Sequence, residues 1–167
     1  MKRGSASIAD SKPSSVRCYH PAIMLKVKLL TTTAKPPTIA HPGEDLGYDL
    51  YAAESTRIPG RGSAVVPTGI SIEFDPIDGR HVGALIRDKS SLAVRRIICT
   101  AGVIDAGYRG EIRVVMENLG DEAAIIHAGE KIANLIPYPV LTSEVEVVDE
   151  LAESCRNAGG FGSTGRR

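Results

Sequence analysis

The stretch Ile70-Ser-Ile-Glu-Phe74 decides the fold class, because apolar side chains alternate there with polar ones. Successive side chains of a β-strand point to opposite faces, so a period of two predicts a strand with one buried face. The same alternation occurs in Leu25-Lys-Val-Lys-Leu29 and around Val145 and Val147. All three segments are therefore predicted to be half-buried strands.

Further short strand candidates follow along the chain, separated by turn residues. They are Ser63–Val66, His81–Arg87, Arg96–Ile104, Glu111–Met116, Ala123–His127 and Lys131–Tyr138. Many short strands between Gly and Pro turns predict an all-β protein, either a closed barrel or a double-sheet jelly roll. Ser90–Arg95 alone has the pattern of a helical turn, with a serine hydroxyl placed as its N-cap.

The length and the charge of the chain exclude several classes of function. A chain of 167 residues is most simply one domain. Lys and Arg total 20, as do Asp and Glu, so no overall field favours direct binding of nucleic acid or an anionic membrane. No segment approaches the roughly 20 apolar residues that span a bilayer. Cys18, Cys99 and Cys155 lack zinc-ligand or CxxC spacing, which predicts reduced thiols and a cytoplasmic protein.

The composition divides the chain into three parts. Residues 1–23 lack the apolar core of a secretory signal and are predicted to be a disordered leader, with organellar targeting left open. Residues 24–152 hold the predicted strands and form the expected β-barrel domain. Residues 153–167 are Gly-rich and aperiodic, which predicts a flexible C-terminal arm.

The segment Gly102-Val-Ile-Asp-Ala-Gly-Tyr-Arg-Gly110 places a carboxylate and an aromatic ring in one turn. The strand-like run Glu111–Met116 follows, so the segment predicts a β-hairpin with Asp105 and Tyr108 at its mouth. An Asp in a hairpin most often only makes the turn. The stretch Arg156–Gly165 strengthens a functional interpretation, because one Phe and one Arg stand there among glycines.

Five blocks in order give the chain a resemblance to the homotrimeric dUTPase family, from about Met24 to the end. The blocks are Gly47–Leu50, Asp88–Ala93, Gly102–Gly110, Gly129–Leu135 and Arg156–Gly165. The resemblance implies a distorted jelly roll with one short helix, assembled as a homotrimer with shared active sites and a swapped C-terminal arm. It also implies Mg²⁺-dependent hydrolysis of dUTP to dUMP and pyrophosphate, which would limit uracil in DNA and supply dUMP for dTMP synthesis.

The same resemblance implies roles for the third block. Asp105 would orient and deprotonate the water that attacks the α-phosphorus. The ring of Tyr108 would lie against the deoxyribose and leave no room for a 2′-hydroxyl. Uracil would pair with main-chain groups of Gly102, Val103 and Ile104, and of the facing strand near Arg113.

Phosphate and metal binding are implied for three other blocks. Lys89, Ser90 and Ser91 stand where the family usually has Arg-Ser-Gly, and Lys89 keeps the charge but loses the planar fork of arginine. Capping of the helix is an alternative role for the two serines. Asp49 matches a carboxylate that reaches Mg²⁺ through water. Asn134 replaces a usual Gln, and a phosphate or water contact and a structural role are both open.

In the last block, Phe161 resembles the ring that stacks on uracil. Arg156 resembles the cation that binds the terminal phosphates, and Gly162 resembles a position where the backbone approaches the ligand.

Two alternative functions remain open beside dUTP hydrolysis. A dCTP deaminase of the same fold would share the Ser-Ser-Leu block but would need a Glu as proton shuttle, for which Glu111 is the nearby candidate. A non-catalytic nucleotide sensor would be consistent with Lys89 and Asn134. A purely structural jelly-roll subunit explains none of the five blocks.

Overall fold

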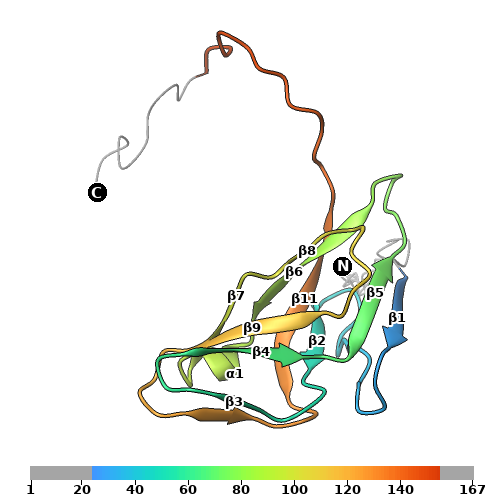
Figure 1. The fold of residues 1–167 in the computed structure, drawn as a ribbon. Helices are drawn as coiled ribbons and strands as arrows, with labels where there is room; N and C mark the ends of the chain where they lie inside the picture. The colour runs from blue at the N-terminus through green and yellow to red at the C-terminus, as the bar shows by residue number, and fades with distance from the viewer. Residues whose placement is uncertain (1–23, 155–167) are drawn as a thin grey trace, which may run out of the picture.

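The computed structural model describes residues 24–154, which form eleven strands and one short helix (Figure 1). The strands are β1 (Leu25–Leu29), β2 (Tyr48–Tyr51), β3 (Thr56–Ile58), β4 (Ser63–Pro67), β5 (Ile70–Phe74), β6 (Val82–Asp88), β7 (Ile97–Thr100), β8 (Val103–Ile104), β9 (Arg113–Asn118), β10 (Ala124–Ile126) and β11 (Lys131–Pro139), and the helix is α1 (Ser90–Ala93).

The strands hydrogen-bond into four groups, ordered β2-β11-β6-β8, β4-β9-β7, β1-β5 and β10-β3. One cluster of buried side chains joins them, because Leu135 of the first group, Met116 of the second, Ile72 of the third and Ile126 of the fourth all belong to it. The prediction of an all-β jelly roll with one short helix is confirmed. The strands predicted from alternation at β1 and β5 pair with each other, from Leu25 opposite Phe74 onward.

Strand β11 organises the first group, because it pairs with β2 on one side and with β6 on the other. Ile132, Ala133 and Leu135 are fully buried, which fixes the strand in the core. In this register Asn134 lies opposite Asp49 of β2 and opposite Arg87 of β6. Three polar residues from distant parts of the sequence are thereby aligned across neighbouring strands.

The predicted strand Arg96–Ile104 is wrong as a single element, because the chain bends between β7 and β8. Ala101 and Gly102 adopt positive φ values of 60° and 103°. Beyond this bend β8 pairs with β6, whereas β7 pairs with β9. The predicted hairpin is therefore wrong, because Val103–Ile104 and the strand that begins at Arg113 belong to different sheets and do not pair with each other.

The prediction of a strand at Val145 and Val147 is also wrong for the described residues. The C-terminal strap, defined here as residues 141–154, contains no strand and leaves the body beyond β11 (Figure 1). Val145 is 91% exposed and Val147 is 93% exposed. Alternation predicts which residues would share a face, but a strand also needs a neighbouring strand, and the described part of the chain supplies none there.

Helix α1 differs from prediction at its first residue. Lys89, not a serine, is the N-cap, and no side chain makes a capping hydrogen bond. Ser90 is the first residue inside the helix and not the N-cap. Its hydroxyl is therefore not in the N-cap position, from which a side-chain oxygen accepts a hydrogen bond from the N2 or N3 amide. Leu92 is buried and fixes this turn to the body. The capping alternative for Ser90 and Ser91 is therefore excluded.

Candidate active site

Asp49 of β2 lies half-buried between two lysines. Lys131 Nζ donates to its Oδ2 at 2.7 Å, and Lys89 Nζ donates to its Oδ1 at 3.1 Å. Burial alone would raise the pKa of Asp49, but the hydrogen bonds and charges of Lys131 and Lys89 outweigh it and lower that pKa. The carboxylate is therefore ionised at neutral pH. Sequence reasoning missed Lys131, because its position beside Asp49 follows from the register of β11 and β2.

A cavity of about 440 Å³ opens beside this carboxylate. It is lined by Thr38, Ala40, Asp45, Leu46, Gly47, Asp49, Arg87, Asp88, Asn134 and Ile136. The side-chain amide of Asn134 donates to the carbonyl of Asp88 at 3.4 Å, which ties β11 to the end of β6. Predicted residues of the first, second and fourth blocks thus gather at one place. The mixture of ammonium, guanidinium, amide and carboxylate groups suits a metal-bound polyphosphate.

Asp105 lies elsewhere, in the exposed turn that follows β8. The backbone amide of Tyr108 donates to the Asp105 carbonyl at 3.0 Å, which closes the turn. The guanidinium of Arg109 donates to the carbonyl of Ala106 at 2.7 Å and lies 3.5 Å from the carboxylate of Glu73. These contacts position Asp105 through the main chain and leave its carboxylate at the surface.

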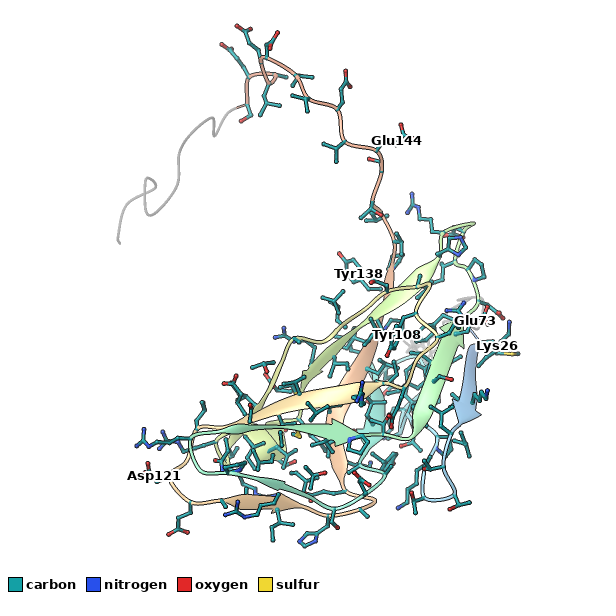
Figure 2. The ribbon with its side chains drawn as sticks, in the orientation of Figure 1. Lys26, Glu73, Tyr108, Asp121, Tyr138 and Glu144 are labelled. Carbon is teal, nitrogen blue, oxygen red and sulfur yellow. The ribbon has the colours of Figure 1, made fainter. Side chains whose placement is uncertain are left out.

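A second cavity of about 430 Å³ lies beside the Asp105 turn. It is lined by Gly83, Ala84, Leu85, Val103, Ile104, Asp105, Ala106, Tyr138, Pro139, Val140, Leu141 and Thr142. Figure 2 shows Tyr108 on the body and Glu144 farther out along the departing strap. Gly102 precedes the lining residue Val103, and its carbonyl accepts from the Ile86 amide at 2.7 Å. This hydrogen bond fixes the peptide group that follows Gly102 against β6.

Asp105 and Lys89 stand at opposite ends of β6. Asp105 lies against Gly83 at one end, and Lys89 directly follows the other. Gly83 and Lys89 are six positions apart, and a strand rises about 3.3 Å per residue, so about 20 Å along β6 separates Asp105 from Lys89. Arg113 is the first residue of β9, in the sheet β4-β9-β7, and it pairs with Pro67 of β4 and not with β8. Arg156, Phe161 and Gly162 lie outside the described residues.

The Glu111 side chain makes a structural hydrogen bond to the backbone. Its Oε1 accepts from the amide of Gly69 at 2.9 Å. A carboxylate that shuttles protons to a bound base must be able to reach that base. This contact to the body counts against the deaminase interpretation, for which Glu111 was the candidate acid.

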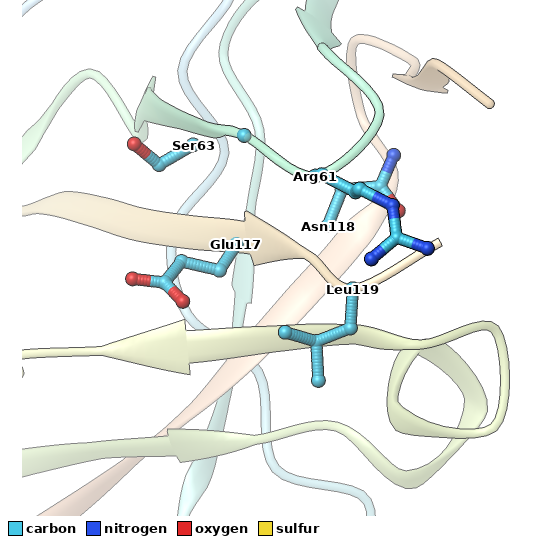
Figure 3. Close-up of a pocket in the computed structure, with 6 residues that line it drawn as sticks. Arg61, Ser63, Glu117, Asn118 and Leu119 are labelled. Carbon is cyan, nitrogen blue, oxygen red and sulfur yellow. The ribbon is translucent and has the colours of Figure 1, made fainter. Parts of the chain in front are cut away.

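A third cavity, of about 350 Å³, lies apart from both groups (Figure 3). It is lined by Arg61, Gly62, Ser63, Glu117, Asn118 and Leu119, and no predicted site residue is among them. The Asn118 side chain donates to the carbonyl of Glu122 at 2.8 Å and accepts from the amide of Gly120 at 2.9 Å. The side chain of Asn118 therefore stabilises the turn after β9.

Among residues 24–154, no three His, Cys, Asp or Glu side chains gather in a way that could hold a metal ion. Asp49 is thus not part of a cage of three or more such side chains in that part of the chain. No helix of the described residues has the length and hydropathy needed to cross a bilayer.

Comparison with known proteins places this geometry in a family. Residues 33–165 match the dUTPase family model. The deoxyuridine 5′-triphosphate nucleotidohydrolase of Gloeothece citriformis is 43% identical over 144 residues, which are 84% of this chain and 96% of that protein. That of Solanum lycopersicum is 39% identical over 166 residues, 96% of this chain and 95% of the relative. The dUTPase of Staphylococcus bacteriophage 80alpha, solved with dUPNHPP, superposes with a TM-score of 0.77 at 27% identity, over 86% of this chain and 99% of that one. This chain belongs to the dUTPase family.

Proposed function

We propose that this chain hydrolyses dUTP to dUMP and pyrophosphate. The observation that carries the proposal is the family match, which runs from residue 33 to residue 165 and spans both groups of predicted residues. The related phage enzyme was solved with dUPNHPP, and the relatives are named for the hydrolysis of deoxyuridine triphosphate. In the cell this reaction would limit uracil incorporation into DNA and supply dUMP for dTMP synthesis.

Asp105 is the proposed general base. Its carboxylate takes a proton from a water molecule, while the water oxygen forms a bond to the α-phosphorus. The bond from that phosphorus to the bridging oxygen breaks, and the electron pair leaves with pyrophosphate. The exposed position of Asp105 supports this role, because the attacking water must reach it.

The cluster beside Asp49 is the proposed phosphate site. Lys89 would release Asp49 and pair with the phosphates, and the Ser90 hydroxyl would donate to the oxygen of the leaving pyrophosphate. Ser91 and Asn134 would add further donors. Both serines are exposed, and α1 does not use them as caps, which supports this role.

Mg²⁺ is the proposed cofactor, and the residues present are compatible with it. Magnesium usually keeps several waters and binds through one or two carboxylates plus substrate phosphates, so one protein carboxylate is the expected complement. Asp49 would hold it through a water. When bound, the metal would neutralise charge on the triphosphate. Lys131 would remain with Asp49 and keep it ionised.

Base and sugar would bind at the Asp105 turn. The bend at Gly102, Val103 and Ile104, with the strand start at Arg113, would offer main-chain donors and acceptors to uracil. Cytosine inverts the donor and acceptor at position 4, which would leave buried polar groups unpaired at about 1–3 kcal/mol each. The ring of Tyr108 would pack on the deoxyribose and exclude a 2′-hydroxyl.

The proposed assembly is a homotrimer with shared sites. A single triphosphate cannot bridge the approximately 20 Å between the ends of β6, so residues of different subunits would complete each site. The exposed strap supports an exchange of C-terminal segments. We divide the chain into a leader (1–23), a barrel (24–152) and an arm (153–167) whose Arg156, Phe161 and Gly162 would close over a neighbouring site.

The decisive experiment measures pyrophosphate release from dUTP, dCTP, dTTP and UTP with Mg²⁺, together with the base in each product. Release from dUTP alone, yielding dUMP, is the expected result. Conversion of dCTP to a uracil nucleotide would instead identify a deaminase. Tight binding of dUTP without release would identify a sensor, and Lys89→Arg would then be the first variant to test.

A further inference from the structure

The ring of Tyr108 lies against Gly110 and reaches Glu111. A Cβ built on Gly110 would lie 2.5 Å from Tyr108 Cζ and 3.0 Å from Cε2. Carbon atoms at optimal contact are about 3.5–4.0 Å apart, so the ring occupies the space that any side chain at position 110 would need. The Tyr108 hydroxyl donates to the carbonyl of Glu111 at 3.0 Å. The ring is therefore folded back on its own loop, with 43% of the residue exposed.

The support under the ring is itself anchored to the body. The Glu111 carboxylate accepts from the Gly69 amide at 2.9 Å, and the Ile112 amide donates to the Ile70 carbonyl at 2.8 Å. Gly69 is buried with a positive φ of 66°, so this anchor stands on a tightly packed turn. The position and orientation of the Tyr108 ring are thus set by its contact with Gly110 and by its hydrogen bond to the carbonyl of Glu111.

We propose that Gly110 is a specificity-determining residue, because its missing side chain lets the Tyr108 ring lie flat where it excludes a 2′-hydroxyl. This inference rests on the proposed hydrolysis of dUTP. The atoms that a new Cβ would meet are at the outer end of the tyrosine side chain. That end can turn away by rotation of χ1, so a methyl group at position 110 displaces the ring while the backbone keeps its course.

The experiment compares Gly110→Ala with Gly107→Ala in the same loop. A Cβ on Gly107 meets no heavy atom within 4 Å, so this control adds the same methyl group in open space. The readout is the ratio of kcat/KM for dUTP to kcat/KM for UTP, with thermal unfolding to check the fold. Gly110→Ala lowers the ratio by about tenfold to a hundredfold, since small misplacements in a site carry costs of that order. Gly107→Ala keeps it.

A double-mutant cycle separates an effect through the ring from general damage to the loop. In a Tyr108→Ala background, Gly110→Ala leaves the ratio unchanged if Gly110 acts through the ring. An unchanged ratio in Gly110→Ala alone, or an equal loss in the Tyr108→Ala background, overturns the inference. A wild-type protein that fails to release pyrophosphate from dUTP overturns the proposed function itself. Wild-type preference for dUTP with no response to Gly110→Ala overturns this inference alone.

Discussion

Asp105 and Asp49 carry the same chemical group in different surroundings. Asp105 stands in an exposed turn and is held there through its main chain. The side chain of Asp49 is 16% exposed and is fixed by two ammonium groups. A carboxylate that must accept a proton from water benefits from access, whereas one that must stay ionised beside a metal benefits from cations. The division of labour therefore follows from where the fold places each side chain.

Replacing Asp105 with Asn removes the proton acceptor and keeps the shape. We expect turnover to fall by about 10²–10⁴-fold, while dUTP still binds. Pyrophosphate release measures the first quantity and calorimetric titration with a non-hydrolysable dUTP analogue the second. Asp78→Asn is the matched control, because Asp78 is exposed in another turn at a φ of 48° that asparagine tolerates. Wild-type turnover in Asp105→Asn would refute the assigned base.

Replacing Lys131 with Met removes a hydrogen bond and a charge that lower the pKa of Asp49. We expect that pKa to rise toward, or above, its ordinary value, because burial then acts with less opposition. In the wild type the stability gained from ionised Asp49 is present above the ordinary carboxyl pKa and is lost as pH falls through the lowered one. The variant should lose this contribution at higher pH. Carboxyl NMR titration checks the pKa, and an unshifted titration would contradict the assigned pair.

At the scale of elements, the sequence predicts strands where one face is buried and the other is not. Strands β1 and β5 follow from this alternation, as do β4, β6, β10 and β11 within a residue or two. Strands β2 and β3, of four and three residues, were not among the predicted strands. The pairing of Lys131 with Asp49 was missed because it depends on long-range register, which local patterns do not encode.

The bend between β7 and β8 depends on Gly102. A Cβ there would lie 2.9 Å from the Ile86 carbonyl oxygen, at a φ of 103°. Gly102→Ala should therefore lower the free energy of unfolding by more than the about 1–2 kcal/mol that a left-handed conformation costs an L-residue. Gly43→Ala is the control, with a φ of 87° and no heavy atom within 4 Å. Denaturant unfolding compares the two, and equal losses would show that Ile86 adjusts without cost.

At the scale of the whole molecule, the proposed function gives the barrel and the C-terminal residues separate tasks. Removal of residues 154–167 should leave the trimer intact, because the barrel and most of the strap remain. Turnover should fall by about a hundredfold, since Arg156 and Phe161 would no longer close over the substrate. Light scattering reports the mass and pyrophosphate release the activity. A monomeric product would mean that these residues are structural.

Sites shared between subunits allow two inactive variants to repair each other. Asp105→Asn removes the proposed base near one end of β6. Ser90→Ala removes a proposed phosphate contact near the other end. When the two chains are unfolded, mixed in equal amounts and refolded together, roughly a quarter of the sites in randomly mixed trimers would combine an intact Asp105 with an intact Ser90. Activity well above that of either variant refolded alone is expected. Its absence would show that each site is built within one chain.

The strap has a consequence for the newly made chain, before any partner is present. Its exposed Val145 and Val147 alternate with Glu144 and Glu146, and Asp149 follows. Like charges directly opposite each other destabilise a pair of strands, so two straps in register repel. We therefore expect these acidic residues to disfavour strand pairing between the exposed valines of two chains. The alternation that suggested a strand would then also oppose aggregation of the unassembled protein.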